Sequence, residues 1–134
     1  MANKTVHVSG KRKLSIARVT VKDGNGVVRI NKKDISLYSP ELAKDKLMEP
    51  LLLAGEVSKK VNINVTVFGG GTLAQAEATR NAIAKALVEW TKSKDLKKTY
   101  LDYDRHLLIA DTRRTEPQKP CRSASRANKQ TSKR

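Results

Sequence analysis

Alternation of apolar and polar residues predicts three strands in the first half of the chain. Residues 14–22 alternate imperfectly but are rich in β-branched side chains, as is typical of a strand. A shorter strand is expected at residues 5–8, followed by a basic loop at residues 9–13. The pattern is clearest at residues 61–68 (VNINVTVF), where four apolar side chains face one way and polar ones the other.

Residues 14–30 predict a β-hairpin. The sequence Asp23-Gly24-Asn25-Gly26 supplies two dipeptides that favour tight turns. Residues 27–30 are then expected to form the returning strand.

Helices are expected in the rest of the first 103 residues. Ser39 can cap a helix in which Pro40 takes the first position and Glu41 faces the positive end of the dipole. This helix should reach about residue 48, because Pro50 kinks or stops it and Gly55 ends whatever follows.

A long helix over residues 72–92 is predicted to be the main core helix. The residues of one helix face recur at steps of three or four positions, and all but one arginine are apolar. They are Leu73, Ala76, Arg80, Ile83, Leu87 and Trp90. A shorter helix is expected at residues 94–103, and residues 107–109 form a short apolar anchor.

The composition changes after Ala110, which divides the chain into a globular body (1–111) and a C-terminal arm (112–134). The arm has eight basic residues, one acidic residue and none of Val, Ile, Leu, Met, Phe, Tyr or Trp. Without apolar side chains to bury, nothing offsets the entropy of ordering its backbone. We therefore predict an extended basic arm, which Pro117 and Pro120 help to keep extended.

Charge narrows the possible partners. The formal net charge is +15, divided into +8 for the body and +7 for the arm, which points to a polyanion and most often to nucleic acid. An anionic membrane surface is the competing partner, but the arm lacks an apolar anchor. With an aromatic content of 4%, the chain is not expected to bind single strands mainly by stacking.

The sequence gives no sign of secretion or of a membrane span. The N-terminus has no apolar signal region, and the apolar runs are too short to cross a bilayer. The single cysteine, Cys121, can form neither an intrachain disulfide nor a cysteine-based zinc site. A cytoplasmic protein is the expectation.

A glycine-only turn, Gly69-Gly70-Gly71, lies between a strand and a helix start. Such a turn lets backbone N–H groups and the helix dipole meet a phosphate, although a tight turn without a ligand is the alternative. The stretch also satisfies G-x-G-x-x-A, a weak match to dinucleotide-binding proteins. The acidic residue at the required distance, Glu89, falls inside the same helix, which counts against that reading.

The densest basic cluster of the body is predicted to contact RNA rather than to be a solvated loop; it comprises Lys11, Arg12, Lys13 and Arg18. Two roles of Arg80 are equally supported: its charged end reaches solvent past the apolar face, or it contacts RNA. The two histidines, His7 and His106, have no neighbours that suggest a catalytic triad or a metal site. We expect no catalytic activity, no metal and no cofactor.

Several motifs resemble one family, that of small ribosomal subunit protein nine, in its archaeal form. Residues 10–19 (GKRKLSIARV) are similar to its opening motif, and residues 69–87 to its G-G-G-x-x-G-Q-A helix. Residues 103–105, 111–117 and 130–134 resemble its C-terminal region. The chain departs from the family pattern at Ala74, where glycine is usual, and at Gln118, Cys121 and Lys133.

The resemblance implies an α+β fold, with a mixed β-sheet packed on helices as in the second domain of ribosomal protein S5. It includes an unusual left-handed βαβ unit and an extended basic tail. It also implies a monomer in the head of the small subunit, bound to the 3′ major domain of the rRNA and to neighbouring head proteins.

The residues expected to bind rRNA combine the basic cluster, the glycine turn and the cations of the C-terminal region. They are Lys11, Arg12, Lys13, Arg18, Gly69, Gly70, Gly71, Gln75, Arg80, Arg105, Arg113, Arg114, Lys119, Arg122, Arg126 and Lys129. The resemblance further implies that Ser132, Lys133 and Arg134 reach the anticodon stem-loop of P-site tRNA.

Two other functions fit the same residues less well. One is a free RNA chaperone or the basic subunit of an RNA-processing enzyme. The other is a nucleotide-binding enzyme that uses the glycine turn.

Overall fold

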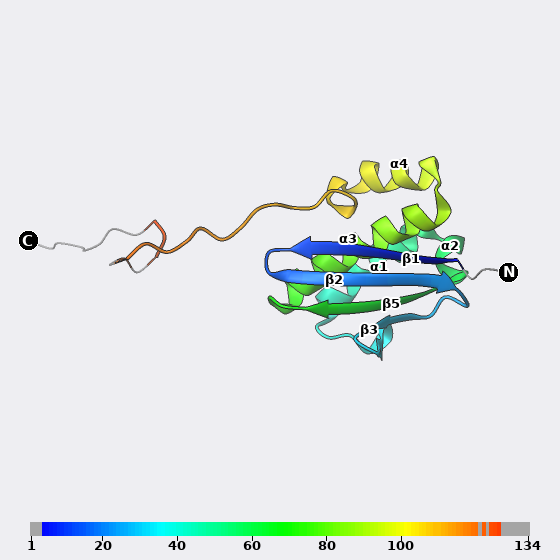
Figure 1. Cartoon of the computed structure of the whole chain (residues 1–134), viewed down its shortest axis with the longest axis horizontal. Helices are drawn as coiled ribbons and strands as arrows, with labels where there is room; N and C mark the ends of the chain where they lie inside the picture. Colours follow the sequence, from blue (N-terminus) through cyan, green and yellow to red (C-terminus); the bar gives the residue numbers. More distant parts are fainter. Residues whose placement is uncertain (1–3, 121, 123, 127–134) are drawn as a thin grey trace, which may run out of the picture.

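A mixed five-stranded sheet forms one layer of the computed structural model, which describes residues 4–120, 122 and 124–126 (Figure 1). The strands are β1 (Thr5–Arg12), β2 (Ser15–Asp23), β3 (Val28–Ile30), β4 (Lys33–Asp34) and β5 (Val61–Phe68). Their order across the sheet is β1-β2-β5-β3-β4. Neighbours are antiparallel, except that β3 and β5 are parallel.

The helices are η1 (Ile35–Leu37), α1 (Glu41–Ala54), α2 (Glu56–Lys59), α3 (Thr72–Thr91), α4 (Lys94–Tyr103) and η2 (Arg105–Leu107), where η denotes a 3₁₀-helix. Helices α1 and α3 form a second layer behind the sheet, and α4 packs on these two helices (Figure 1). The predicted α+β class with a mixed sheet is therefore confirmed. The expected strand at residues 61–68 and the expected helices at 72–92 and 94–103 are confirmed within one residue.

The core lies between the two layers. From the sheet it takes the alternating residues Ala17, Val19 and Val21 of β2 and the four valine and isoleucine side chains of β5. From α3 it takes the predicted face, except that Leu73 is half-exposed and Arg80 is engaged in ion pairs. Gly10 allows close packing, because a Cβ there would lie 2.4 Å from the carbonyl oxygen of Ala78 in α3.

The predicted hairpin over residues 14–30 is wrong. Strand β2 turns back on β1, and β3 pairs in parallel with β5 instead of returning along β2. The side chain of Asn62 in β5 explains the route, since its Oδ1 accepts hydrogen bonds from the backbone N–H groups of Asn25 (3.0 Å) and Val27 (3.1 Å). These bonds hold the glycine-rich turn at the end of β5, so that β3 lies on the edge of β5 opposite to β2.

The predicted basic loop at residues 9–13 is also wrong for most of its length. Strand β1 continues to Arg12, and the turn is confined to Lys13 and Leu14, where Lys13 adopts a φ of 51°. Full pairing of Ser9 to Arg12 with β2 satisfies the backbone groups that a loop would leave to solvent.

The βαβ unit β3-α1-β5 is left-handed, as the resemblance implied. In Figure 1 the helices lie behind the sheet, and both strands point to the left with β3 below β5. With the strands turned to point upward, the chain passes behind the sheet from β3 on the left to β5 on the right. That sense is opposite to the usual right-handed crossover.

Helix α1 begins one residue later than predicted and ends six residues beyond the predicted end. Pro40 occupies the cap position without a side-chain hydrogen bond, and the helix continues through Pro50 to Ala54. Pro50 lacks the N–H that would bond one turn back, but it is buried in the core, and its carbonyl accepts a 2.7 Å hydrogen bond from the Tyr100 hydroxyl. Gly55, with a φ of 55°, ends the helix as predicted.

The chain leaves the body through the predicted anchor. Leu107 is fully buried, whereas Ile109 is about half-exposed. Beyond Leu108 the described residues form no helix or strand and run away from the body (Figure 1). The boundary between body and arm at residue 112 stays a prediction.

Candidate nucleic-acid interface

The four residues of the predicted basic cluster point in different directions. Because neighbouring strand residues face opposite sides, Lys11 is exposed on the side of the sheet away from the helices, whereas Arg12 faces α3. Arg18 is also exposed on the helix-free side, where its guanidinium lies 5.6 Å from the centre of the Phe68 ring. Lys13 is exposed at the β1–β2 turn.

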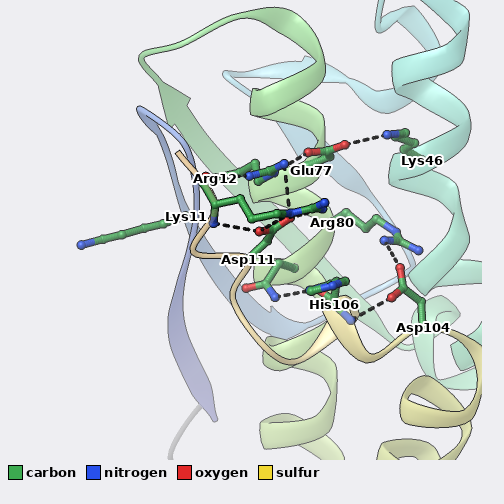
Figure 2. Close-up of a pocket in the computed structure, with 10 residues that line it drawn as sticks. Lys11, Arg12, Lys46, Glu77, Arg80, Asp104, His106 and Asp111 are labelled. Atoms are coloured by element: carbon green, nitrogen blue, oxygen red, sulfur yellow. Dashed lines mark hydrogen bonds and ion pairs between the residues drawn. The ribbon is translucent and has the colours of Figure 1, made fainter. Parts of the chain in front are cut away.

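Arg12 is held by the protein itself. Its Nε donates to Glu77 Oε2 at 2.8 Å, its Nη2 lies 3.2 Å from Asp111 Oδ2, and its Nη1 donates to the backbone oxygen of Arg113 at 3.2 Å. The side chain is 13% exposed. Arg12 therefore joins β1, α3 and the beginning of the arm, as Figure 2 shows.

Asp111 completes this joint from the other side. Its carboxylate accepts hydrogen bonds from the Arg113 side chain (2.7 and 3.1 Å) and backbone N–H (3.0 Å). These bonds and the nearby Arg12 lower the pKa of Asp111 well below its usual range. The first residues of the arm are thus fixed to the body by charge as well as by Leu107.

Glu77 lies between two cations. Its Oε1 accepts a 2.8 Å hydrogen bond from Lys46 in α1, and its Oε2 accepts the bond from Arg12. Partial burial would raise the pKa of Glu77, but the hydrogen bonds and charges of Lys46 and Arg12 outweigh it and lower the pKa.

Arg80 makes two ion pairs inside the body. Its Nε lies 2.5 Å from Glu49 Oε2, at an angle that departs from a hydrogen bond, and its Nη1 donates to Asp104 Oδ2 at 2.8 Å. With 14% of its side chain exposed, it ties α3 to α1 and to the residue that caps η2. Its contacts support a structural role that neither of the two sequence-based alternatives included, and an RNA contact by Arg80 stays a prediction.

These side chains line one polar hollow beside the root of the arm (Figure 2). Four cations each face a carboxylate there, namely Arg12, Lys46, Arg80 and Arg113. A phosphate entering the hollow would have to compete with Glu77, Asp104 and Asp111. We interpret it as an ion-pair network that stiffens the body, which residue composition alone did not reveal.

The structure of the body itself requires glycine at two of the three positions of the glycine turn. Gly69 and Gly70 have φ values of 77° and 66°, and a Cβ on Gly70 would lie 2.3 Å from Ser15 Oγ. The carbonyl of Gly69 accepts hydrogen bonds from Ser15 Oγ (2.8 Å) and Gln75 Nε2 (3.1 Å). Gln75, predicted to contact rRNA, therefore also closes this turn.

Gly71 differs from its two neighbours. It has a φ of −96°, nothing lies within 4 Å of a Cβ built there, and it precedes α3 without a side-chain cap. Its small size is therefore not required by packing inside the body. The predicted phosphate contact at this helix start stays a prediction.

The described cations of the C-terminal region are mostly free to meet a partner. Arg105, Arg114, Lys119 and Arg122 are exposed. Arg113 pairs with Asp111, and Arg126 pairs with Glu116 through a 2.9 Å hydrogen bond. Lys129 and the predicted tRNA-binding residues Ser132, Lys133 and Arg134 lie outside the described residues.

In the part of the chain that the structure describes, no helix is long and apolar enough to cross a membrane. Within the same residues, no group of three or more His, Cys, Asp or Glu side chains could hold a metal ion.

Comparison with known proteins identifies the class. The family described as "Ribosomal protein S9/S16" matches residues 10–134. "Small ribosomal subunit protein uS9" from Methanococcus maripaludis is 50% identical over 131 residues, which cover 96% of this chain and 98% of the relative. The protein of that name from Methanococcus vannielii is 49% identical over the same length.

These matches define a structural ribosomal protein rather than an enzyme. The chain belongs to the ribosomal protein S9/S16 family. The resemblance inferred from residues 10–19, 69–87 and the C-terminal motifs is thereby confirmed, including its archaeal-like form.

Proposed function

We propose that this chain, as a structural constituent of the small ribosomal subunit, binds rRNA of the subunit head with its body and arm. We further propose that the arm's last residues contact the anticodon stem-loop of P-site tRNA. The observation that carries this proposal is the arm itself, with eight cations, one carboxylate and no large apolar side chain. Such a segment cannot form a core, but it can follow closely packed phosphates.

The joint at Arg12 and Asp111 supports different roles for the root of the arm and for the cations beyond it. It holds the first residues of the arm against β1 and α3, while Arg114, Lys119 and Arg122 stay exposed. A fixed root gives the arm a defined starting direction. The cations beyond it are then available to phosphates along its path, and Ser132, Lys133 and Arg134 at its end are assigned to tRNA.

The rRNA contact is tested by salt dependence. Binding of the full chain to a 3′ major domain rRNA fragment is compared with binding of a chain that ends at residue 111. Six of the eight arm cations are assigned to rRNA, and each phosphate contact contributes roughly −0.7 to −0.9 to the log–log salt slope. Removing the arm should therefore make the slope shallower by about 4 to 5. A slope unchanged by truncation would show that the arm does not bind rRNA.

A further inference from the structure

The face of the sheet opposite the helices is uncovered throughout the described residues (Figure 1). The strand residues that point to this open face alternate with buried core residues and are predominantly polar. They are Thr5, His7, Ser9 and Lys11 in β1, Ile16, Arg18, Thr20 and Lys22 in β2, Asn62, Asn64, Thr66 and Phe68 in β5, and Arg29 in β3. A polar face of this kind is not half of an apolar core and is open to solvent or to a polar partner.

The net positive charge of the body is concentrated in residues 4–40, which include three of the four strands that build this face, β1, β2 and β3. Residues 4–40 contain nine basic and two acidic side chains, whereas residues 41–104, which include α1 to α4, contain ten basic and nine acidic ones. Among the described residues of β1, β2, β3 and β5 that point to the open face, none is acidic. Asp34 of the edge strand β4 lies opposite Arg29 in the strand register.

The strand register arranges these side chains in rows across the sheet. One row contains His7, Thr20, Asn64 and Arg29, and the next contains Ser9, Arg18 and Thr66. Two hollows of the open face meet at Thr66, one lined by His7 and Arg18 and the other by Arg29 and Asn64. Hydroxyl and amide groups thus lie between cations along the face.

We propose that this open face binds the minor groove of double-helical RNA, an inference that rests on the proposed rRNA-binding function. The minor groove of an RNA helix is wide and shallow and displays 2′-hydroxyl groups, so a flat surface can reach it. Thr20, Asn64 and Thr66 can exchange hydrogen bonds with 2′-hydroxyls, while Arg18, Lys22 and Arg29 meet the flanking phosphates.

Single-stranded RNA fits the face less well. Sheets that bind single strands stack two or three bases on aromatic side chains. Phe68 is the only aromatic side chain besides His7 among the described residues of this face, and Arg18 lies against its ring. The open face therefore favours an RNA duplex recognised by its shape and backbone.

The test compares two full-length variants that each lose two positive charges. Lys22→Gln with Arg29→Gln removes cations from the open face, and Lys94→Gln with Lys98→Gln removes exposed cations from α4 as a matched control. The probes are a 20-base-pair RNA duplex, a DNA duplex of the same sequence and a 20-nucleotide RNA strand. Thermal unfolding of each variant verifies the fold.

The open-face variant should make the salt slope for the RNA duplex shallower by about 1 to 2, because each lost cation removes one phosphate contact, while the control keeps the wild-type slope. A separate variant, Asn64→Ala with Thr66→Val, changes no charge and should lower the preference for RNA over DNA duplex by about tenfold. Both effects are expected without a change in the arm.

Three results would overturn the inference. The first is an equal change of the salt slope in the open-face and control pairs, and the second is an unchanged preference for RNA over DNA duplex in Asn64→Ala with Thr66→Val. The third is that Phe68→Ala loses binding of the RNA strand but keeps binding of the RNA duplex. None of them contradicts the proposed function. Its rRNA-binding part fails if the wild-type chain does not prefer the 3′ major domain fragment over an unrelated RNA of equal length.

Discussion

At the scale of single residues, identity alone does not separate structural from binding roles. Arg12 and Arg18 lie six positions apart in the same basic motif, yet Arg12 is engaged by Glu77 and Asp111 while Arg18 faces outward over Phe68. Removing Arg12 would take one of two cationic partners from each of two partly buried carboxylates, Glu77 and Asp111. Loss of RNA binding in an Arg12 variant would therefore need a stability measurement before it could be assigned to a lost RNA contact.

The glycine turn makes a prediction at this scale. Gly70→Ala should lower the free energy of unfolding by about 1–3 kcal/mol, because a Cβ at a φ of 66° meets Ser15 Oγ. Gly71→Ala is the control and should change it by less than about 0.5 kcal/mol, since its φ is negative and the space around it is open. Urea unfolding checks both, and equal losses in the two variants would contradict the assigned roles.

At the scale of elements, long-range contacts decide what local sequence signals leave open. Helix α1 passes through Pro50 because the core side of the helix is buried and α4 supplies a hydrogen-bond donor to the Pro50 carbonyl. Strand β3 pairs with β5 because Asn62 holds the preceding turn.

The bond between α4 and α1 can be tested directly. Tyr100→Phe should lower the free energy of unfolding by about 1–2 kcal/mol, because the fully buried hydroxyl donates to the Pro50 carbonyl. Tyr103→Phe is the matched control, since Tyr103 is 56% exposed, and it should have almost no effect. If chemical unfolding gives the same free energy of unfolding for the two variants, this bond does not stabilise the packing of α4 on α1.

The sequence was most informative where a periodic pattern is long and local. The alternation in residues 61–68 and the helical repeat in residues 72–92 predicted β5 and α3 almost to the residue. Strand β3 was found, but not its partner, because the pairing depends on Asn62, more than thirty positions away. The partners of Arg12 and Arg80 were missed for the same reason, although strand parity could have shown that Arg12 faces inward.

At the scale of the whole molecule, the body and the arm meet at a small electrostatic joint. Leu107 anchors the chain in a second apolar cluster with Ala84 and Tyr100, and Asp111 then bridges Arg12 and Arg113. Beyond this point the described chain has few contacts with the body (Figure 1). The joint determines where the arm begins, and the partner is expected to determine its path.

Loosening the joint should expose the root of the arm. Asp111→Asn removes the charge shared by Arg12 and Arg113, so trypsin should cleave after Arg113 and Arg114 several-fold faster in the protein without RNA. Asp102→Asn, an exposed change in α4, should leave the cleavage rate unchanged. Equal rates in the wild type and Asp111→Asn would show that the joint does not hold the arm.

The proposed contact with P-site tRNA is tested most directly by the rate at which that tRNA dissociates from small subunits. Subunits carrying a chain without Ser132, Lys133 and Arg134 should assemble normally and release P-site tRNA faster, because two cations next to the tRNA backbone are lost. Subunits carrying Lys119→Gln with Arg122→Gln lose the same charge within the arm and should release it at the wild-type rate. An unchanged dissociation rate in the truncated subunits, or an equal increase in both variants, would contradict the role assigned to the end of the arm.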